Sequence, residues 1–352
     1  MADQMRLTQT ALPDALESLE RCRTLVLPAL HDAVDRLHPS VARMASFAFG
    51  WCDVHGVRRG GSGGKGLRPA LAVLCAEAVG GSSEDAVAGA VAVELVHAFS
   101  LVHDDIMDGD ERRRHQETLW KAFGVGPAVL AGDALLALAL STIGSTAGAA
   151  AAMLSDALIE LVEGQAADIS FEGRPWAGAH AVTVDEYTAM AADKTGSLLA
   201  CAAGLGALLG GGGPDAAAAM STAGRHLGLG FQAIDDLLGI WGDPLVTGKP
   251  VFSDLRRRKK TLPVVFAATV DGGAHAGLLG HLLNTAPDAP ERDLDLQRAA
   301  DLIAHVGGRA FGADQSDGHL RQALEIIEAT AVNPTAAAEL TELARFVADR
   351  SH

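Results

Sequence analysis

Apolar residues recur every three or four positions along much of this chain, which is the spacing of a helix with one buried face. Residues 14–37 show this pattern and predict an amphipathic opening helix, and residues 70–79 predict a second, more apolar one. Alanine and leucine are frequent, aromatic residues make up 4% of the chain, and β-branched residues rarely occur in runs. This composition favours helices over strands. We therefore expect an all-α fold, a helical bundle in a single domain over residues 1–352.

One uncharged stretch, residues 134–155, is long enough to cross a bilayer. It consists mostly of small residues, it is flanked by acidic residues, and no cluster of Lys or Arg marks a cytoplasmic end. We expect two packed core helices that meet near residues 144–148, and no membrane span. Further along, the glycine-rich residues 204–214 predict a loop, and Asn333 followed by Pro334 predicts a helix start.

The segment 94–108 has the spacing of a buried helix but ends in three carboxylates, on Asp104, Asp105 and Asp108. At about 100° per residue, His97, Asp104 and Asp108 fall on one stripe of that helix. Like charges this close raise one another's pKa unless a cation lies between them. Mg²⁺ is the natural partner, because it prefers oxygen ligands and often combines one or two protein carboxylates with substrate phosphates. A solvated acidic helix end is the alternative for this segment taken alone.

A second segment, residues 231–243, repeats the design, with an apolar helical pattern that ends in Asp235 and Asp236. Gln232 lies about one turn before these acids. Two such helices that face each other would form an acidic clamp, which suits metal ions that hold a polyanion. The repetition makes a solvated helix end a less favourable interpretation of either segment.

The formal net charge of −16 argues against nucleic acid or an anionic membrane surface as a partner, because both would be repelled. A polyanionic substrate such as a diphosphate, which the acidic clamp would bind through metal ions, would be repelled as well. Metal ions and clustered Lys and Arg residues would have to supply positive charge locally. Candidate clusters are Lys65 with Arg68 after a glycine-rich turn, residues 112–114, and residues 256–260. Each cluster could also be an ordinary surface loop, and the run 256–260 alone would suggest a nucleic-acid patch.

The cysteines are widely separated and form no Cys-x-x-Cys motif, which indicates reduced core thiols in a cytoplasmic protein; they are Cys22, Cys52, Cys75 and Cys201. Residues 1–13 show no basic segment followed by an apolar one, so no secretory signal is evident. We therefore expect a cytoplasmic location.

The two aspartate-rich segments, in order with the basic ones, resemble the motifs of the trans-isoprenyl diphosphate synthases, the polyprenyl synthetase family. The further matching segments are residues 63–69, 113–114, 194–195, 247–250 and 259–263. Any one of these is a weak signal, whereas the ordered set is specific. The resemblance implies an isoprenoid synthase fold, in which helices surround a central cavity and both aspartate segments lie at its mouth. It also implies a homodimer and Mg²⁺ as cofactor, with three ions in each active site.

The resemblance also implies a role for each matching residue. It implies that the metal ions are held by Asp104, Asp108 and Asp235, with Asp105 beside them in the catalytic set. It implies that isopentenyl diphosphate, which binds without metal, is held by Lys65, Arg68, His97 and Arg114. It implies that the allylic diphosphate is bound, and its departure assisted, by Arg113, Lys194, Thr195, Gln232, Lys249 and Lys259. A helix that carries Gln165 and Asp168 resembles a family helix beside the metals.

The chain departs from the family pattern at Gly66, where an arginine is usual, and at Gly239, where many members carry a third acid. One phosphate contact is then missing or supplied by another residue. In the second segment, metal binding would depend on Asp235, alone or together with the acid that follows it. Asp243 could contribute from the same helical stripe only if the helix continues beyond Gly242.

The residues themselves permit a definite chemistry. Metal ions at two carboxylate helices would grip a diphosphate ester and neutralise charge on the departing group. An allylic ester would leave a carbocation, which needs an apolar chamber that excludes water. The activity implied is head-to-tail condensation of isopentenyl diphosphate with a C5, C10 or C15 allylic diphosphate, in which the double bond of isopentenyl diphosphate meets that cation.

In the family, bulk four and five positions before the first aspartate sets the floor of the chamber, and here Ser100 and Phe99 stand there. One aromatic residue without an insertion resembles producers of geranylgeranyl diphosphate (C20), while farnesyl or longer products stay open. One alternative is a class I terpene cyclase, which would normally carry one aspartate-rich motif and a different metal triad. The other is a non-catalytic partner subunit, which only Gly66 and Gly239 favour.

Overall fold

Helices form almost all of the regular structure in the described part of the chain, as the sequence pattern predicts. The computed structural model describes residues 4–59, 64, 66–113, 116–144, 148–244, 250–286 and 289–348, with residues 4–14 described by their backbone. The chain divides into two compact units. The first comprises Met1–Leu158, Leu198–Gly224 and Leu324–Phe346, and the second comprises Ile159–Ser197, Arg225–Ala323 and Val347–His352.

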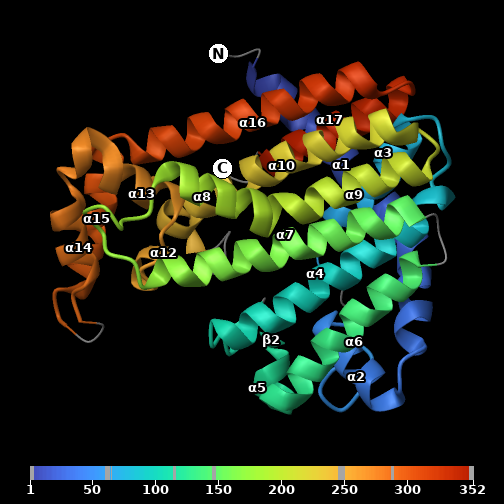
Figure 1. Cartoon of the computed structure of the whole chain (residues 1–352), viewed down its shortest axis with the longest axis horizontal. Helices are drawn as coiled ribbons and strands as arrows, with labels where there is room; N and C mark the ends of the chain where they lie inside the picture. The colour runs from blue at the N-terminus through green and yellow to red at the C-terminus, as the bar shows by residue number, and fades with distance from the viewer. Residues whose placement is uncertain are drawn as a thin grey trace. The chain divides into compact units, whose positions relative to one another are not determined.

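The central element of the first unit is helix α4, Val87–Met107, which packs against helix α6, Val125–Ile143 (Figure 1). Leu95 of α4 and Leu135 of α6 are fully buried, and burial of each leucine side chain contributes about 1.5–3 kcal/mol. The other elements that lie wholly in this unit are α1 (Gln4–Asp35), α2 (Pro39–Ala48), α3 (Leu67–Ala78), η1 (Glu84–Ala86), α5 (Leu119–Phe123) and an antiparallel ribbon of β1 (Arg112–Arg113) and β2 (Gln116–Glu117). Helices α1 and α3 also pack against α4.

The second unit has two buried apolar clusters. One surrounds Ile240, Leu255 and Leu279, and the other includes Tyr187 and Leu262. The elements that lie wholly in this unit are α8 (Val184–Ala191), a π-helical turn η2 (Ala192–Gly196), α12 (Ser253–Arg256), α13 (Leu262–Thr269), η3 (Val270–Gly273), α14 (Ala276–Leu283) and α15 (Arg292–His305). Helices with residues in both units are α7 (Gly148–Glu172), α9 (Ser197–Leu209), α10 (Gly213–Trp241), α16 (Gly308–Thr330) and α17 (Pro334–Ala348).

Two helical stretches, Glu84–Met107 and Val125–Ile143, are long and apolar enough to cross a membrane by length and composition alone. They correspond to η1 with α4 and to α6, which pack against each other inside the first unit, and core helices of globular proteins share this composition. The uncharged stretch 134–155 is two helices, as predicted, since α6 ends at Ile143 and α7 begins at Gly148.

The loop predicted for residues 204–214 is wrong in its first half. Helix α9 continues to Leu209, and α10 begins at Gly213 after a short turn. A Cβ atom at Gly206 would lie 2.1 Å from the carbonyl oxygen of Ala72. This glycine therefore allows α9 to pack on the backbone of α3, and a run of glycines alone does not distinguish such close packing from a turn.

The helix start predicted at Asn333 and Pro334 is confirmed. Helix α17 begins at Pro334, and the Asn333 side-chain oxygen accepts hydrogen bonds from the backbone N–H groups of Thr335, at 3.1 Å, and Ala336, at 3.4 Å. The cap satisfies N–H groups that have no partner within the helix.

Candidate functional site

The first acidic segment ends helix α4, where Asp104 and Asp108 lie one turn apart. The helix continues to Met107, and Asp108 keeps helical backbone angles, with its N–H donating to the Asp104 carbonyl oxygen at 2.8 Å. Both side chains are half-buried. The helical backbone confirms the prediction that these two carboxylates share one stripe with His97.

Asp105, between these acids in the sequence, is 5% exposed. Its Oδ1 accepts a hydrogen bond from Nε of Arg113 at 2.8 Å and lies 2.8 Å from Nη2 of the same guanidinium. Burial raises the pKa of Asp105, while the Arg113 guanidinium opposes that shift. Asp105 therefore holds Arg113, a predicted ligand of the allylic diphosphate, in a fixed position.

Two predicted ligands of isopentenyl diphosphate lie together. Nη1 of Arg68, in the first turn of α3, is 3.1 Å from Nε2 of His97 on α4. Gly66 precedes this turn with a φ of +66°, a left-handed conformation that costs a residue with a side chain about 1–2 kcal/mol. Glycine at position 66, where the family usually has arginine, therefore suits the left-handed backbone conformation found there. The predicted ligands that lie outside the described residues are Lys65, Arg114 and Lys249.

Phe99 and Ser100, the predicted chain-length positions, are half-buried on α4. The Phe99 ring meets the His103 ring edge-on, with centroids 4.8 Å apart. Nε2 of His103 lies 3.2 Å from the carbonyl oxygen of Val129, and a Cβ at Gly132 would lie 2.2 Å from the same nitrogen. Phe99 is thus braced by a second ring that is itself held against α6.

The paired acids of the second segment differ in exposure: Asp235 is exposed, whereas Asp236 is 2% exposed. Asp236 accepts hydrogen bonds from the Leu262 N–H at 2.8 Å, from the Gln232 amide at 2.9 Å and from the Tyr187 hydroxyl. Burial raises the pKa of Asp236 to about 7, although these donors oppose the shift. Asp235 is therefore the acid of the pair that is open to a metal ion, and Asp236 is part of the buried core.

A carboxylate from another element lies where position 239 would carry a side chain. A Cβ at Gly239 would lie 1.9 Å from Oδ2 of Asp254, which belongs to α12, and the Ser253 hydroxyl donates to the Gly239 carbonyl oxygen at 3.1 Å. Asp243 is not on the same helical stripe, because α10 ends at Trp241.

Two predicted cationic ligands, Lys194 and Lys259, lie near Asp168 of α7. Nζ of Lys194 lies 2.5 Å from Oδ2 of Asp168, and Nζ of Lys259 lies 3.9 Å from the same oxygen. Lys259 also pairs with Glu172 at 2.7 Å. The carboxylates of Asp168 and Glu172 balance the charge of these two ammonium groups. A bound diphosphate would attract the same ammonium groups away from the carboxylates.

A chain of hydrogen bonds runs through the predicted substrate-binding residues. Thr195 follows Lys194 in the π-helical turn η2, and its hydroxyl donates to the side-chain oxygen of Gln232 at 2.7 Å. Gln232 in turn donates to Asp236. Single π-helical turns recur at functional sites, because they redirect side chains that a regular helix would hold in line.

A sequence profile of the family described as polyprenyl synthetase matches residues 59–298. The chain belongs to the polyprenyl synthetase family. One curated relative, the (2E,6E)-farnesyl diphosphate synthase of Mycobacterium tuberculosis, is 42% identical over 352 residues, which cover 99% of this chain and 96% of the relative. The geranylgeranyl diphosphate synthase of the same organism is 42% identical over 311 residues, which cover 87% of each chain.

A solved polyprenyl synthetase, from Streptomyces coelicolor A3(2), is 47% identical, with a TM-score of 0.86 over 94% of this chain and 98% of that one. The molecule therefore has the isoprenoid synthase fold, and it is a prenyltransferase, a short-chain trans-prenyl diphosphate synthase. This result favours the predicted enzyme class over the terpene cyclase and over the non-catalytic subunit.

Polyprenyl synthetases use divalent metal ions, and a solved relative complexed with calcium and isoprenyl diphosphate is among the structural matches. In the part of this polyprenyl synthetase that the structure describes, no three His, Cys, Asp or Glu side chains form a group that could hold a metal ion. Mg²⁺ commonly takes one or two protein carboxylates and completes its octahedron with water and substrate phosphates. The carboxylates that suit it are the Asp104 and Asp108 pair and the exposed Asp235.

Sequence reasoning missed three residues of this polyprenyl synthetase site. Tyr187 donates to Asp236, Asp254 lies against Gly239, and Gly164 of α7 lies against the turn that carries Lys194. A signal existed for Tyr187, because it is the chain's single tyrosine and a buried hydroxyl requires a partner. The other two depend on contacts between elements that are distant in the sequence.

We expect Tyr187→Phe to lower the free energy of unfolding by about 1.5–3 kcal/mol, because a buried carboxyl group loses a hydrogen-bond donor. Urea unfolding followed by circular dichroism measures this change. Thr188→Val is the matched control, since its hydroxyl donates to the Val184 carbonyl within the same helix. Equal losses in both variants would contradict the role assigned to Tyr187.

Proposed function

We propose that this polyprenyl synthetase condenses isopentenyl diphosphate with C5, C10 or C15 allylic diphosphates and releases geranylgeranyl diphosphate (C20). The observation that carries the proposal is the ring of Phe99, which the His103 ring contacts edge-on, while His103 itself lies against Val129 and Gly132 of α6. A bulky ring held by a packed neighbour limits the room for a growing apolar chain. The geranylgeranyl diphosphate synthase relative, 42% identical, is in keeping with this product.

Farnesyl diphosphate (C15) is the second candidate product. The farnesyl diphosphate synthase relative matches 99% of this chain at 42% identity, whereas the geranylgeranyl diphosphate synthase relative matches 87% at the same identity. Similarity along the chain therefore does not separate the two products, and the proposal of C20 depends on the side chain at position 99.

In the proposed reaction, Asp104, Asp108 and Asp235 hold Mg²⁺, three ions in each active site. When bound, the metal neutralises negative charge on the departing diphosphate. The cationic side chains that bind diphosphate oxygens are Arg113, Lys194, Lys249 and Lys259, of which Arg113 is oriented by Asp105. Isopentenyl diphosphate is held by Lys65, Arg68, His97 and Arg114.

Thr195 and Gln232 have a second proposed role, beside the developing allylic cation. The Thr195 hydroxyl hydrogen is directed to Gln232, at 2.7 Å, which leaves oxygen lone pairs available to a positive charge. The surrounding apolar helices exclude water, which would otherwise convert the cation to an alcohol.

The test is incubation of the purified protein with Mg²⁺, isopentenyl diphosphate and, separately, C5, C10 and C15 allylic diphosphates, followed by mass analysis of the products. We expect the C20 diphosphate as the end product from each primer. Phe99→Ala should lengthen the product, and Ser100→Ala is the matched control that should not. A C15 end product would support the farnesyl alternative, and no elongation of any primer would overturn the proposed function.

We also propose that two copies of the chain associate in solution. Several apolar side chains of α6 are exposed; they are Val125, Val129, Leu130 and Leu140. Clustered exposed apolar side chains of this kind favour an interface, and sedimentation equilibrium would contradict the proposal if it returned the mass of one chain at micromolar concentration. A cytoplasmic location fits the four free, buried cysteines.

We propose that the two compact units unfold together as a single domain, which calorimetry tests as one cooperative transition.

A further inference from the structure

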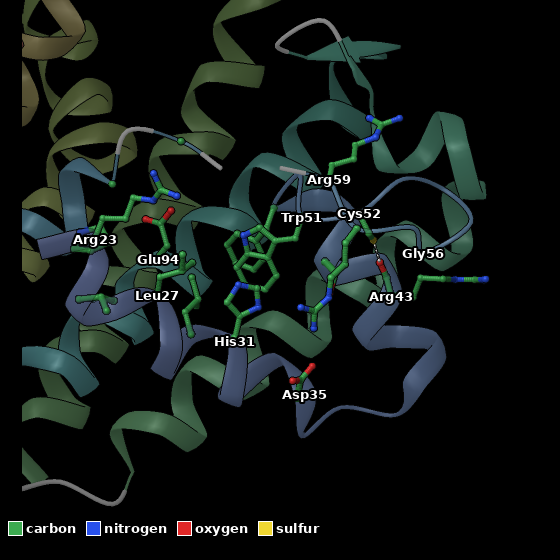
Figure 2. A pocket seen from close by; sticks show the side chains of 18 residues that line it. Arg23, Leu27, His31, Asp35, Arg43, Trp51, Cys52, Gly56, Arg59 and Glu94 are labelled. Carbon is green, nitrogen blue, oxygen red and sulfur yellow. Dashed lines mark hydrogen bonds between the residues drawn. The ribbon is translucent and has the colours of Figure 1, made fainter. Parts of the chain in front are cut away.

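A cavity of about 490 Å³ lies in the first unit, lined by α1, α2, the segment after α2, the start of α3 and α4 (Figure 2). In Figure 2, His31 and Trp51 lie against each other in the middle of the lining, with Arg23 and Glu94 to one side and Arg43 and Arg59 to the other. Its volume is that of a small-molecule site. Neither Arg68 nor His97, the predicted isopentenyl diphosphate ligands, lines it.

The segment after α2 is folded back on itself and is well braced. Cys52 and Arg58 form an antiparallel bridge, and the Arg59 N–H donates to the Trp51 carbonyl oxygen at 2.9 Å. Oδ1 of Asp53 accepts hydrogen bonds from two backbone N–H groups inside the turn, each at 2.9 Å. The backbone that carries two adjacent arginines is thereby fixed beside a tryptophan, although both arginine side chains are exposed. A fixed backbone reduces the entropy lost on binding.

The aromatic side chains of the lining form one stack. Phe49 and Trp51 are parallel within 13°, with centroids 4.5 Å apart, and the His31 ring lies 3.7 Å from Trp51. Burial lowers the pKa of His31, so this imidazole is neutral at pH 7. The stack offers an uncharged, rigid surface to the organic part of a ligand.

The charge of the lining is opposite to that of the whole protein. The lining includes four arginines, at positions 23, 43, 58 and 59, and two acids, Asp35 and Glu94, in a chain of formal net charge −16. In the part of the chain that the structure describes, no acidic side chain pairs with Arg43, Arg58 or Arg59. Guanidinium groups without a carboxylate partner bind phosphate oxygens well, because their planar fork matches two oxygens at once.

We propose that this cavity is a second ligand site, which binds an organic phosphate. Arg43 and Arg58 hold its phosphate or diphosphate group, and its organic part lies against the stack of Phe49, Trp51 and His31. Gly64 and Gly66 line the same cavity and flank Lys65 in the sequence. A bound ligand therefore touches the segment on which the proposed isopentenyl diphosphate site depends, and we expect it to regulate that substrate's KM.

Trp51 provides a direct readout, because it lines the cavity. The experiment is titration of tryptophan fluorescence in EDTA with inorganic diphosphate, adenosine diphosphate and geranyl diphosphate, with Trp51→Phe protein as the baseline. We expect a saturable change with at least one of the two esters, at lower concentration than with inorganic diphosphate. The tighter ester identifies the ligand as a nucleotide or a prenyl diphosphate. No saturable change, or equal affinity for all three probes, would overturn the proposal.

The double variant Arg43→Ala, Arg58→Ala should weaken binding of the tighter ester at least about tenfold. The matched control is the double variant Arg298→Ala, Arg345→Ala, which removes two exposed arginines elsewhere and should bind within about twofold of the parent. Arg68→Gln should also keep the response. If Arg68→Gln loses it while the double variant at positions 43 and 58 keeps it, the signal belongs to the substrate site and the proposal fails. The titration needs no turnover, so its failure leaves the proposed function untouched.

Discussion

Asp104→Asn and Asp108→Asn are each expected to lower kcat at least about 100-fold, since changes in the shell around a bound metal already cost 10–100-fold and these are the proposed ligands themselves. The fold should persist. The two carboxylates are half-buried at the end of α4 and lie one turn apart, so removal of one charge relieves a like-charge pair and raises stability by about 0.2–0.5 kcal/mol. Steady-state kinetics with Mg²⁺, together with urea unfolding of each variant, measures both effects.

Asp133→Asn is the control for this prediction. Asp133 is exposed on α6 in the same unit, 3.9 Å from Nε2 of His103, and its removal changes the net charge equally. Its kcat should stay close to that of the parent. A second readout is Tm, which Mg²⁺ with diphosphate should raise by binding the folded state. Asp104→Asn and Asp108→Asn should both lose this rise in Tm. Normal turnover in Asp104→Asn and Asp108→Asn would refute the metal-binding role.

Gly164→Ala is expected to lower the free energy of unfolding by about 1–3 kcal/mol through overpacking. A Cβ at this position would lie 2.3 Å from the backbone nitrogen of Lys194 and 2.7 Å from its Cα. Backbone atoms of a packed turn cannot move aside as the end of a flexible side chain can, so α7 and η2 must separate. The Lys194 ammonium group then leaves Asp168, and kcat falls as well.

The sign of this effect is diagnostic. Alanine is favoured over glycine by about 0.5–1 kcal/mol within a helix, so propensity alone predicts that Gly164→Ala stabilises the protein. Gly148→Ala, in the first turn of the same helix, is the control, because a Cβ there meets nothing within 4 Å. It should be neutral or stabilising by urea unfolding. A Gly164→Ala protein that is as stable and as active as the parent would show that α7 and η2 can adjust to the extra atom.

Local patterns predicted the elements that carry the site. Helical spacing placed Asp104 and Asp108 on one stripe, and Asp108, the residue after the end of α4, keeps helical backbone angles. The pairing of Thr195 with Gln232, by contrast, links residues 37 positions apart. The family resemblance named both residues without indicating that they touch.

The different fates of Asp235 and Asp236 could not be predicted from their neighbours in the sequence. Both acids follow the same apolar pattern, yet one is exposed and the other is buried among Tyr187, Gln232 and the Leu262 N–H. Burial depends on which side of α10 meets α8 and α13, and those helices are distant in the sequence. The resemblance named Asp235 and not Asp236 as a metal ligand, but the physical difference between the two acids, exposure against burial, became visible only with these contacts.

By itself, the sequence determined the helical class, the helix that presents the first carboxylate pair, the cap of α17 and the ordered motifs of a polyprenyl synthetase. These features depend on interactions within a few residues or on residue order, both of which are written along the chain. Only the tertiary structure decided which acids are buried, why Gly239 lies against Asp254, and that four arginines from separate parts of the chain line one cavity. These features depend on the approach of distant elements, whose distances no local spacing encodes.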